Sequence, residues 1–469
     1  MKFKIYFKER VITFKMKISL VQKYNVPGPR YTSYPTVPYW ESDKFSREKW
    51  IETLKRSFHE SNPSQGVSLY IHLPFCESLC TFCACNKRIT KQHSVEKPYV
   101  ETVLKEWKLY AGLLNERPVI KEIHLGGGTP TFFSPENLEY LVRQLFEIAE
   151  TAPGPEFSFE GHPNNTQREH LKTLYELGFR RVSFGVQDLD PIVQKAIHRI
   201  QTFEKVKEVT DWSREIGYSS VSHDLIFGLP HQTLEGMLHT MEKVNELKPD
   251  RISFYSYAHV PWIKGVGQRG FREEDLPSAA LKRNLYESGK KALEEKGYKE
   301  IGMDHFTLPT DSMYTAMKEN RLHRNFMGYT SSRTQLMIGL GVSSISDSWY
   351  GFAQNAKTVE EYTDMVGHGE LPVFKGHILS GEDLVIRRHI LNIMCRMETS
   401  WPEPDMKLEG MKEIFPRLEE LEKDGLIEIT DEKLIVKEKG RPFLRNICMP
   451  FDLKMMRNEP ESRIFSMTV

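Results

Sequence analysis

The sequence predicts an α/β protein, built as an open, partial (β/α)6 barrel followed by a mainly helical C-terminal domain. Between about residues 67 and 257, six short β-rich runs alternate with helical patterns. Alternation of this kind indicates βαβ units and a parallel sheet. Beyond residue 266 the pattern becomes largely helical. Six units are too few for the closed eight-stranded barrel, so we expect the sheet to remain open.

The predicted strands follow one another in the chain as VSLYIHLP (67–74), IKEIHLGGG (120–128), EFSFEGHP (156–163), RVSFGVQ (181–187), VSHDLIFGLP (221–230) and RISFYSYAHV (251–260). Each is rich in β-branched or aromatic residues. Intervening segments at 99–114, 167–179 and 233–249 are apolar at helical spacing, as expected of helices that pack on a sheet.

Polar or glycine-rich residues follow each predicted strand. In order, they are a cysteine loop, GGGTPT (126–131), Glu160, Gln187, Asp224 and the pair Tyr257–Ala258. In parallel α/β folds, ligands bind at the edge where strands end, because loops and helix N-termini meet there. The sequence therefore predicts one shared site along this edge.

The chain divides into four predicted parts: an N-terminal extension and site-covering segment (1–60), the partial barrel (61–265), a connecting region (266–375) and a helical C-terminal domain (376–469). Residues 416–447 indicate a helix, two short strands around a turn, and a second helix. This order resembles a winged helix. DNA binding is one interpretation, but a packed lid domain is favoured, because the net charge is +0.

The 469 residues include 27% charged and 39% hydrophobic residues, as is typical of a globular protein. The N-terminus has no unbroken apolar core and no cleavage site, so we predict neither a signal peptide nor stable membrane insertion. We interpret it as a frayed tail, and Met16 is an alternative start. A cytoplasmic location follows, in which clustered thiols stay reduced and serve metal binding or catalysis.

Four of the six cysteines fall within ten residues, as Cys76-x3-Cys80-x2-Cys83 followed by Cys85. A structural zinc site favours two separated pairs of ligands, and a redox dithiol would leave two thiols unused. An iron–sulfur cluster is held at this kind of close spacing. If three cysteines hold a [4Fe–4S] cluster, one iron has no protein ligand and is open to a substrate.

A CxxxCxxC loop after the first strand of a βα barrel resembles the radical S-adenosylmethionine (SAM) superfamily. The resemblance implies that the open iron chelates SAM and that one electron from the reduced cluster generates a 5′-deoxyadenosyl radical. The segment GGGTPT resembles the one that holds the amino group of SAM in that superfamily.

Further stretches narrow the resemblance to the oxygen-independent coproporphyrinogen III oxidases. These include PGPRYTSYPT (27–36), GVQDLD (185–190), HDLIFGLPHQT (223–233), IGMDHF (301–306), LHRNFMGYT (322–330) and RNICM (445–449). The resemblance runs from about Tyr24 to Met456. It implies oxidative decarboxylation of two propionates of coproporphyrinogen III, which yields the vinyl groups of protoporphyrinogen IX in haem biosynthesis.

The resemblance also assigns residues. Cys76, Cys80 and Cys83 match the cluster ligands, and Cys85 matches a further cysteine of the oxidase signature that does not ligate the cluster. Contacts to the SAM on the cluster match Tyr70, Gly127 and Glu160. Contacts to a second SAM match Phe82, Gly128, Thr129, Gln187, Arg199, Asp224, Ala258 and Ile345. The electron donor implied is flavodoxin- or ferredoxin-like, the electron acceptor is not identified, and we expect a monomer.

Several residues keep two interpretations. His72 is a proton donor or a satisfied core histidine, and the latter is favoured. Arg30, in the rigid segment 27–36, is expected to lie over the site opening. Arg324, Arg387 and Arg388 are candidates to meet the propionates of the substrate, although arginines on a helix face are more often solvated. His162 departs from the family, which commonly has an acidic residue before the proline.

Rival functions remain. A related haem-binding chaperone shares the three-cysteine barrel, but that family tends to carry an aromatic residue in place of Cys85 and lacks PGPRYTSYPT. A radical SAM methyltransferase or cyclase with another substrate is a second alternative. A non-catalytic, DNA-binding iron–sulfur protein is a third, but the strand region EITDEKLIVKEK alternates charges where a basic wing would be needed.

Overall fold

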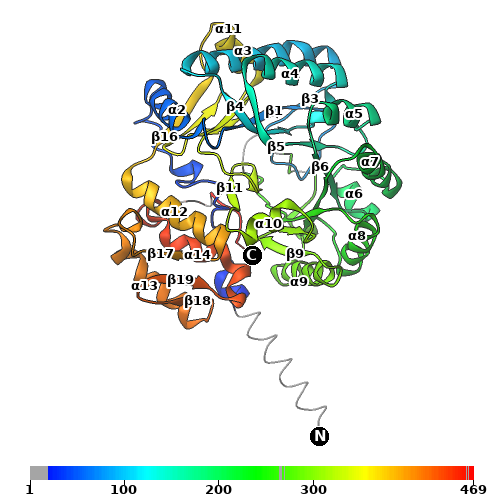
Figure 1. The fold of residues 1–469 in the computed structure, drawn as a ribbon. Helices are drawn as coiled ribbons and strands as arrows, with labels where there is room; N and C mark the ends of the chain where they lie inside the picture. Colours follow the sequence, from blue (N-terminus) through cyan, green and yellow to red (C-terminus); the bar gives the residue numbers. More distant parts are fainter. Residues whose placement is uncertain (1–19, 263–266, 269, 461, 463, 469) are drawn as a thin grey trace.

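The computed structural model describes residues 20–262, 267–268, 270–460, 462 and 464–468 (Figure 1). The predicted N-terminal tail up to residue 19, with its alternative start at Met16, lies outside these residues. In the described ranges, no helix combines the length and apolar character that a bilayer crossing requires.

Six parallel strands form the centre of the fold and confirm the predicted partial barrel. They are β1 (Val67–Leu73), β4 (Val119–Gly127), β5 (Glu150–Gly161), β6 (Arg181–Gln187), β7 (Ser220–Phe227) and β8 (Arg251–Ser256). Each pairs with the next in chain order, as right-handed βαβ crossovers produce. Their C-terminal ends therefore lie along one edge, where the cysteine loop leaves β1.

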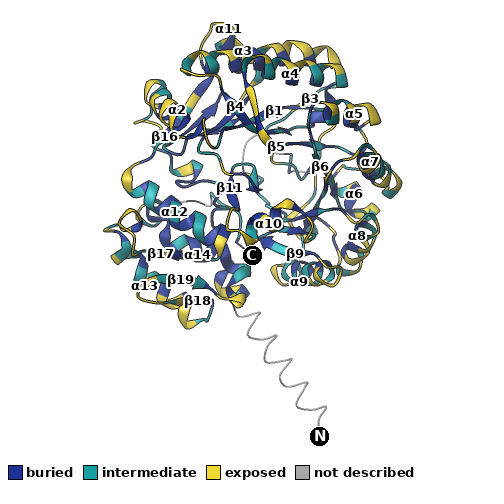
Figure 2. Ribbon diagram, in the orientation of Figure 1, coloured by how far each residue is buried: buried dark blue, intermediate teal, exposed yellow. Residues whose placement is uncertain are grey.

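Helices cover the outer face of these strands (Figure 1). They are α3 (Glu96–Leu113), α4 (Pro135–Ile148), α5 (Arg168–Glu176), α7 (Phe203–Ile216) and α8 (Leu234–Leu247). Ser134, Thr202 and Thr233 each cap a helix by accepting a backbone N–H bond from its first turn. Figure 2 shows mostly buried and partly buried residues along the central strands and many exposed residues on the helices around them.

The main sheet continues beyond the six predicted strands. On one edge, β13 (Met337–Leu340) pairs in parallel with β1, and β14 (Ile345–Asp347), β15 (Gly351–Asn355) and β16 (Val373–Ile378) follow antiparallel. On the other edge, β10 (His305–Thr307) and β9 (Lys299–Gly302) extend β8. Much of the region 266–375, predicted as a connection, is thus part of the barrel sheet, and residue 265 does not end that sheet.

Further helices and short strands before residue 376 lie around this sheet. They are α2 (Arg47–Ser61), β2 (Phe75–Cys76), β3 (Arg88–Ile89), α6 (Pro191–Ala196), α9 (Ala279–Glu295), α10 (Ser312–Lys318), β11 (His323–Asn325), β12 (Gly328–Thr330) and α11 (Val359–Gly367). The predicted N-terminal part therefore contains a helix, α2, that packs on β15 and β16.

The C-terminal region contains α12 (Gly381–Arg396), β17 (Glu398–Ser400), α13 (Met411–Lys423), β18 (Ile427–Ile429), β19 (Lys433–Val436), α14 (Leu444–Cys448) and α15 (Leu453–Arg457). The predicted order of helix, two strands and helix is present as α13, β18, β19 and α14. Tyr31 and Tyr34 of the N-terminal segment are buried in the same core as Ile393 and Ile447. The chain's N-terminal segment is therefore held by the C-terminal domain.

A buried carboxyl group ties α3 to the added strands. Glu106 accepts hydrogen bonds from the Gly341 amide (2.8 Å), the Tyr362 hydroxyl (2.7 Å) and the Asn355 side-chain amide (2.6 Å). Burial raises the pKa of Glu106 to about 7. The three donors offset only part of the cost of burying the charge, so protonation of Glu106 favours the folded state.

We expect Glu106→Gln to remove part of the pH dependence of stability. The folded pKa of Glu106 exceeds its ordinary value of 4.5. Its contribution is therefore fully present below pH 4.5 and is lost as the pH rises to about 7. The native chain should lose up to about 3 kcal/mol from this group over that range. Urea unfolding of the variant at pH 5 and pH 7.5 should show a smaller difference in stability, whereas the same substitution at the exposed Glu116 should leave that difference unchanged. An unaltered pH dependence in Glu106→Gln would contradict the shifted pKa.

Candidate active site

The cysteine loop folds back on itself at the end of β1. Cys76 ends β2, which pairs with β3, and the Cys83 amide donates to the Cys80 carbonyl at 3.2 Å. The Lys87 ammonium group donates to the carbonyls of Cys83 (3.2 Å) and Cys85 (3.3 Å). The Thr81 amide donates a hydrogen bond to the Ile197 carbonyl, and the Thr81 hydroxyl donates to the Ala196 carbonyl. These two bonds anchor the loop to the end of α6.

The loop opens onto a cavity of about 160 Å³ at the C-terminal ends of the strands. Most of the predicted site residues share this cavity. Its lining includes Cys76, Cys80, Phe82, Cys83, Cys85, Gly127, Gly128, Thr129, Glu160, Gln187, Arg199 and Asp224. The polar strand ends thus meet at one place, together with all four clustered thiols.

Three predicted residues lie elsewhere. Tyr70 lies on β1 outside the cavity lining, and its hydroxyl is 3.1 Å from Nδ1 of His72. Ala258 is joined to the cysteine loop by the Gln268 amide, which donates to the carbonyls of Phe82 and Ala258 at 3.0 Å each. Ile345 lies on β14 in an apolar cluster with Trp40. The assignment of Ile345 to a SAM contact stays a prediction.

The glycines at the end of β4 allow the backbone there to lie against the backbone that enters the cysteine loop. The Gly128 amide donates to the Leu73 carbonyl at 2.8 Å, and a Cβ at Gly128 would lie 2.5 Å from the Pro74 carbonyl oxygen. Gly127 has a φ of +114°, in the left-handed region that favours glycine. The close approach required at Gly128 is therefore to the start of the cysteine loop.

Charge at the cavity differs between the thiols. Burial raises the pKa of Cys76 to about 11. A hydrogen bond with Cys85, together with the charges of Lys87 and Arg199, lowers the pKa of Cys83 below its ordinary value. The Arg199 guanidinium group lies 3.8 Å from the Cys80 sulfur and donates to the Gly185 carbonyl at 2.5 Å. These two cations favour thiolates, the form of cysteine that binds metal.

Two carboxyl groups line the cavity from β5 and β7, which lie on either side of β6. Glu160 lies 3.3 Å from Nε2 of His124, and Asp224 accepts from the Ser183 hydroxyl at 2.9 Å. Burial and the charge of Glu160 raise the pKa of Asp224 to about 6. Both groups can accept hydrogen bonds from hydroxyl or ammonium donors of a ligand.

The two histidines considered in the sequence are neutral and have partners. Nε2 of His72 lies 2.9 Å from the Asn86 carbonyl, and burial lowers the pKa of His72. His72 is therefore the satisfied core histidine that was favoured. His162 accepts from the Asn164 amide, and burial with the charge of Arg199 lowers the pKa of His162 to about 2. Where the family commonly has an acidic residue, this chain therefore has a neutral histidine, His162, that accepts a hydrogen bond.

The residues present fit an iron–sulfur cluster. Three thiols at the predicted spacing line one cavity, beside two cations that stabilise thiolates. Among the described residues, no three His, Cys, Asp or Glu side chains are placed to hold one single ion. Ligands of a four-iron cluster bind different irons, so they need not converge on one point. Cys76, Cys80 and Cys83 would hold the cluster.

Together, the partial barrel and the three-cysteine loop define a radical SAM protein, and residues 70–244 match the Radical SAM superfamily. The chain is 38% identical to the oxygen-independent coproporphyrinogen III oxidase of Helicobacter pylori, covering 93% of this chain and 96% of the relative. It is 36% identical to the Escherichia coli enzyme, covering 96% and 98%. This chain belongs to the family of oxygen-independent coproporphyrinogen III oxidases.

A solved structure supports the same assignment. Coproporphyrinogen III oxidase from Escherichia coli, described as a radical SAM enzyme, superposes with a TM-score of 0.85 at 36% identity. The match covers 90% of this chain and 97% of the other. The fold and the family therefore agree along nearly the whole length.

Sequence reasoning missed Lys87 and His124, which lie beside the predicted site residues. Lys87 follows the cysteines directly in the stretch CNK, and His124 alternates with buried residues on β4. Of the arginines considered for the substrate, Arg387 is buried against Asp347 at 2.6 Å, and Arg388 pairs with Asp405 on the surface. Neither lines the cysteine cavity.

Proposed function

We propose that this chain converts coproporphyrinogen III to protoporphyrinogen IX without oxygen, as a radical SAM oxidoreductase of haem biosynthesis. The observation that carries the proposal is the three-cysteine loop at the ligand-binding edge of the barrel, in a chain 36–38% identical to enzymes with that name. When bound, the cluster and SAM supply a radical that removes one hydrogen atom from each reacting propionate.

The reaction changes two propionate side chains and requires SAM to be bound beside them. Each reacting propionate loses a hydrogen atom from its β-carbon, carbon dioxide, and one electron, and it becomes a vinyl group. We propose that two SAM molecules bind. Tyr70, Gly127 and Glu160 would contact the first; Phe82, Gly128, Thr129, Gln187, Arg199, Asp224, Ala258 and Ile345 would contact the second. Cys85 lies in the same cavity and is proposed as a catalytic residue that does not ligate the cluster.

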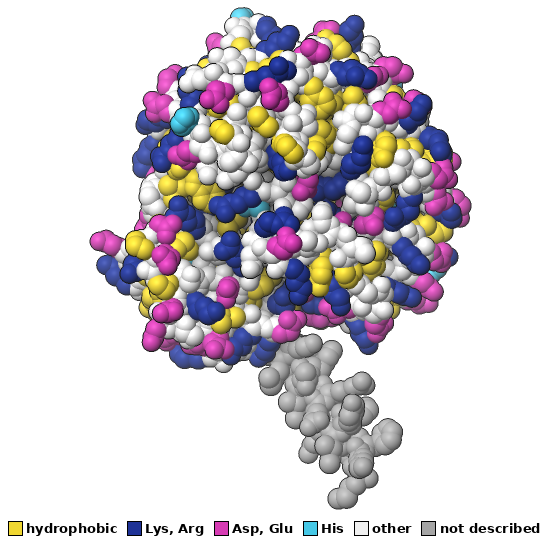
Figure 3. Space-filling model, in the orientation of Figure 1, with side chains coloured by type: hydrophobic (Ala, Val, Ile, Leu, Met, Phe, Trp, Pro, Cys, Tyr) yellow, Lys and Arg dark blue, Asp and Glu magenta, His cyan; other side chains and the backbone are white. Residues whose placement is uncertain are grey.

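A flavodoxin- or ferredoxin-like protein is proposed as electron donor, and we propose a cytoplasmic monomer that binds no nucleic acid. The short strands of the C-terminal domain support the proposal that the chain binds no nucleic acid. Lys433 pairs with Glu398 at 3.1 Å, and Lys437 pairs with Glu428 at 3.4 Å, so these lysines do not form a free basic wing. Over this domain, Figure 3 shows basic and acidic side chains interspersed.

An anaerobic assay tests the proposal. The protein is reconstituted with iron and sulfide, and then supplied with SAM, a reductant, an electron acceptor and coproporphyrinogen III. We expect protoporphyrinogen IX together with 5′-deoxyadenosine. Stable uptake of haem without any divinyl product would favour the chaperone alternative and contradict the proposal.

A further inference from the structure

Four segments that are far apart in the sequence meet around Asp304. Arg30 comes from the N-terminal segment, Arg324 from β11 and Arg445 from α14. Nη2 of Arg30 lies 2.5 Å from the Asp304 carboxylate, and Arg324 donates to the Arg30 carbonyl at 3.3 Å. Each segment belongs to a stretch on which the family resemblance rests. None of these four residues lines the cysteine cavity, so the role of the four stretches is not explained by that cavity.

Positive charge is in excess at this cluster. Arg324 and Arg445 are only 4% and 7% exposed, and Asp304 is 6% exposed. Arg445 donates to backbone carbonyls, including those of Pro29 and Met467 at 2.9 Å each. Nε and Nη1 of Arg324 are buried without a hydrogen-bond acceptor among the described residues. Buried cations are costly unless an anion pairs with them. Asp304 already pairs with Arg30, so the positive charge of Arg324 and Arg445 has no anion of its own among the described residues, which indicates that a further anion can bind here.

The other polar groups nearby do not supply that anion. Nδ1 of His305 lies 2.8 Å from Asp304 and adds a second partner to the same carboxylate. Burial raises the pKa of the Cys395 and Cys448 thiols, so both stay neutral. The Tyr329 ring lies under Arg324, with the guanidinium carbon 4.6 Å from the ring centroid. That ring stabilises Arg324 only in part.

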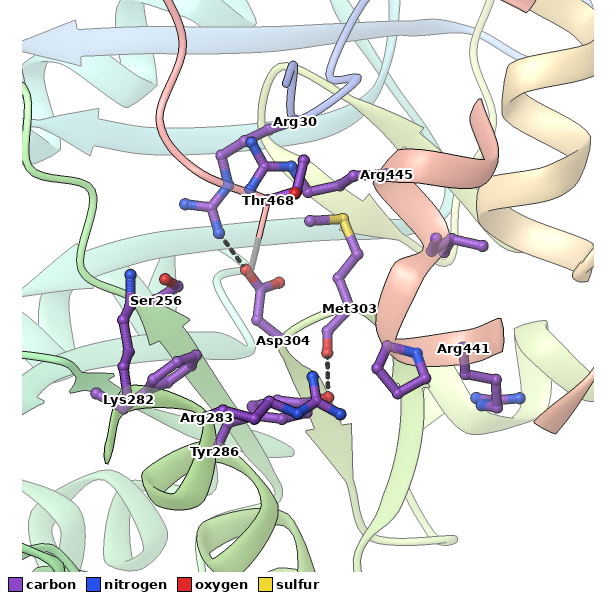
Figure 4. Close-up of a pocket in the computed structure, with 13 residues that line it drawn as sticks. Arg30, Ser256, Lys282, Arg283, Tyr286, Met303, Asp304, Arg441, Arg445 and Thr468 are labelled. Carbon is purple, nitrogen blue, oxygen red and sulfur yellow. Dashed lines mark hydrogen bonds and ion pairs between the residues drawn. The ribbon is translucent and has the colours of Figure 1, made fainter. Parts of the chain in front are cut away.

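A cavity adjoins the cluster, and Figure 4 shows Arg30 reaching Asp304 and Lys282 pointing toward the space beside it. The cavity has a volume of about 70 Å³ and is lined by these residues and Ser256. A water molecule needs only about 10–15 Å³ of such space, so a carboxylate group can be accommodated. Arg324 lies behind this lining and contributes charge from there.

The cavity lies beside the reaction site. Ser256 ends β8, two residues before Ala258. The guanidinium carbon of Arg30 lies 5.9 Å from the centroid of the Tyr255 ring. Tyr255 lines the barrel interior together with Asp224, which also lines the cysteine cavity. A ligand that reaches from the cysteine cavity across the end of β8 would therefore meet these cations.

We infer that Arg30 and Lys282 form a carboxylate site that holds a propionate of the substrate which is not decarboxylated, with Arg324 and Arg445 supplying positive charge from behind. The inference rests on the proposed function. A guanidinium fork matches the geometry of a carboxylate, and such charge-assisted pairs are strong where water is excluded. Two propionates must be retained, and anchoring one of them positions the reacting side chains near Asp224.

Porphyrin binding to the reconstituted protein tests the inference. Coproporphyrin III, the oxidised and fluorescent form of the substrate, carries all four propionates. Mesoporphyrin IX carries ethyl groups in place of the two reacting ones. We expect Arg30→Met and Lys282→Met each to weaken the binding of both porphyrins by about tenfold. Arg143→Met is the matched control, because Arg143 is exposed on α4, where it pairs with Glu139, and it should bind both porphyrins as the native chain does.

Arg324→Met separates a binding role from a structural one. Removing an incompletely paired buried cation should leave the melting temperature unchanged or raise it, while porphyrin affinity falls. A lower melting temperature with unchanged affinity would overturn the part assigned to Arg324. Arg324→Lys keeps the charge without the fork, and it should lie between the native chain and Arg324→Met in affinity.

The remaining outcomes are distinct. If coproporphyrin III binding weakens in Arg30→Met and Lys282→Met but mesoporphyrin IX binding does not, the site holds a reacting propionate and the inference is wrong. If both variants bind both porphyrins normally while the native chain makes protoporphyrinogen IX, only this inference fails. If the native chain neither binds coproporphyrin III nor turns over coproporphyrinogen III, the proposed function fails with it.

Discussion

Cys80→Ser should lose the iron–sulfur cluster and should reduce SAM cleavage to 5′-deoxyadenosine by more than about 100-fold. A serine hydroxyl does not ionise near neutral pH and is a poor ligand for iron that favours thiolate. The two cysteines outside the loop, Cys395 and Cys448, are buried in the core of the C-terminal domain, so neither can replace Cys80. Iron and sulfide content and 5′-deoxyadenosine formation are measured after anaerobic reconstitution.

Cys85→Ser is the matched control. All four cysteines line the cavity, so position alone does not separate ligands from the remaining thiol. We expect Cys85→Ser to keep native iron and sulfide content and to cleave SAM in the absence of substrate, while formation of the divinyl product falls. Loss of the cluster in Cys85→Ser with retention in Cys80→Ser would reverse the ligand assignment.

Gly128→Ala should uncouple β4 from the cysteine loop. The added Cβ would lie 2.5 Å from the Pro74 oxygen and 3.0 Å from the Phe75 oxygen, and both are backbone atoms that cannot turn aside. Two backbone hydrogen bonds hold this junction: the Gly128 amide donates to the Leu73 carbonyl, and the Thr129 amide donates to the Phe75 carbonyl. The substitution must lengthen both. We expect a stability loss of about 1–3 kcal/mol. A displacement of about 1 Å at the site should lower SAM cleavage about 100-fold.

Gly112→Ala provides the comparison. Gly112 lies in the last turn of α3, and a Cβ there would meet nothing within 4 Å. We expect Gly112→Ala to be neutral or to stabilise the protein by up to about 1 kcal/mol, with native SAM cleavage. Thermal unfolding and 5′-deoxyadenosine formation are measured for both variants. Native SAM cleavage by Gly128→Ala would show that this junction does not position the site.

The six central strands could be predicted because each is a β-rich run between helical patterns, long enough for the alternation to be clear. The strands β13 to β16 could not be predicted in the same way, since β13 and β14 have only four and three residues. Their place in the sheet depends on pairing with β1, which no local pattern reveals. The connecting region 266–375 was therefore assigned without its strands.

The candidate site divides similarly. The cysteine loop and the polar strand ends could be predicted, because parallel strands bring their C-terminal ends to one edge. The Arg30, Arg324 and Arg445 cluster could not, since it joins segments separated by up to hundreds of residues. The resemblance assigned Gly128 to a SAM contact, which stays a prediction, and the structure adds a close approach between Gly128 and the backbone at Pro74 that no sequence pattern indicated.

Electron paramagnetic resonance of the reduced, reconstituted protein, recorded with and without SAM, tests most directly whether the loop leaves one iron without a protein ligand. We predict a [4Fe–4S] signal that changes when SAM is added, because SAM binds the open iron. A cluster signal that SAM leaves unchanged, or protein that retains only zinc, would contradict the account.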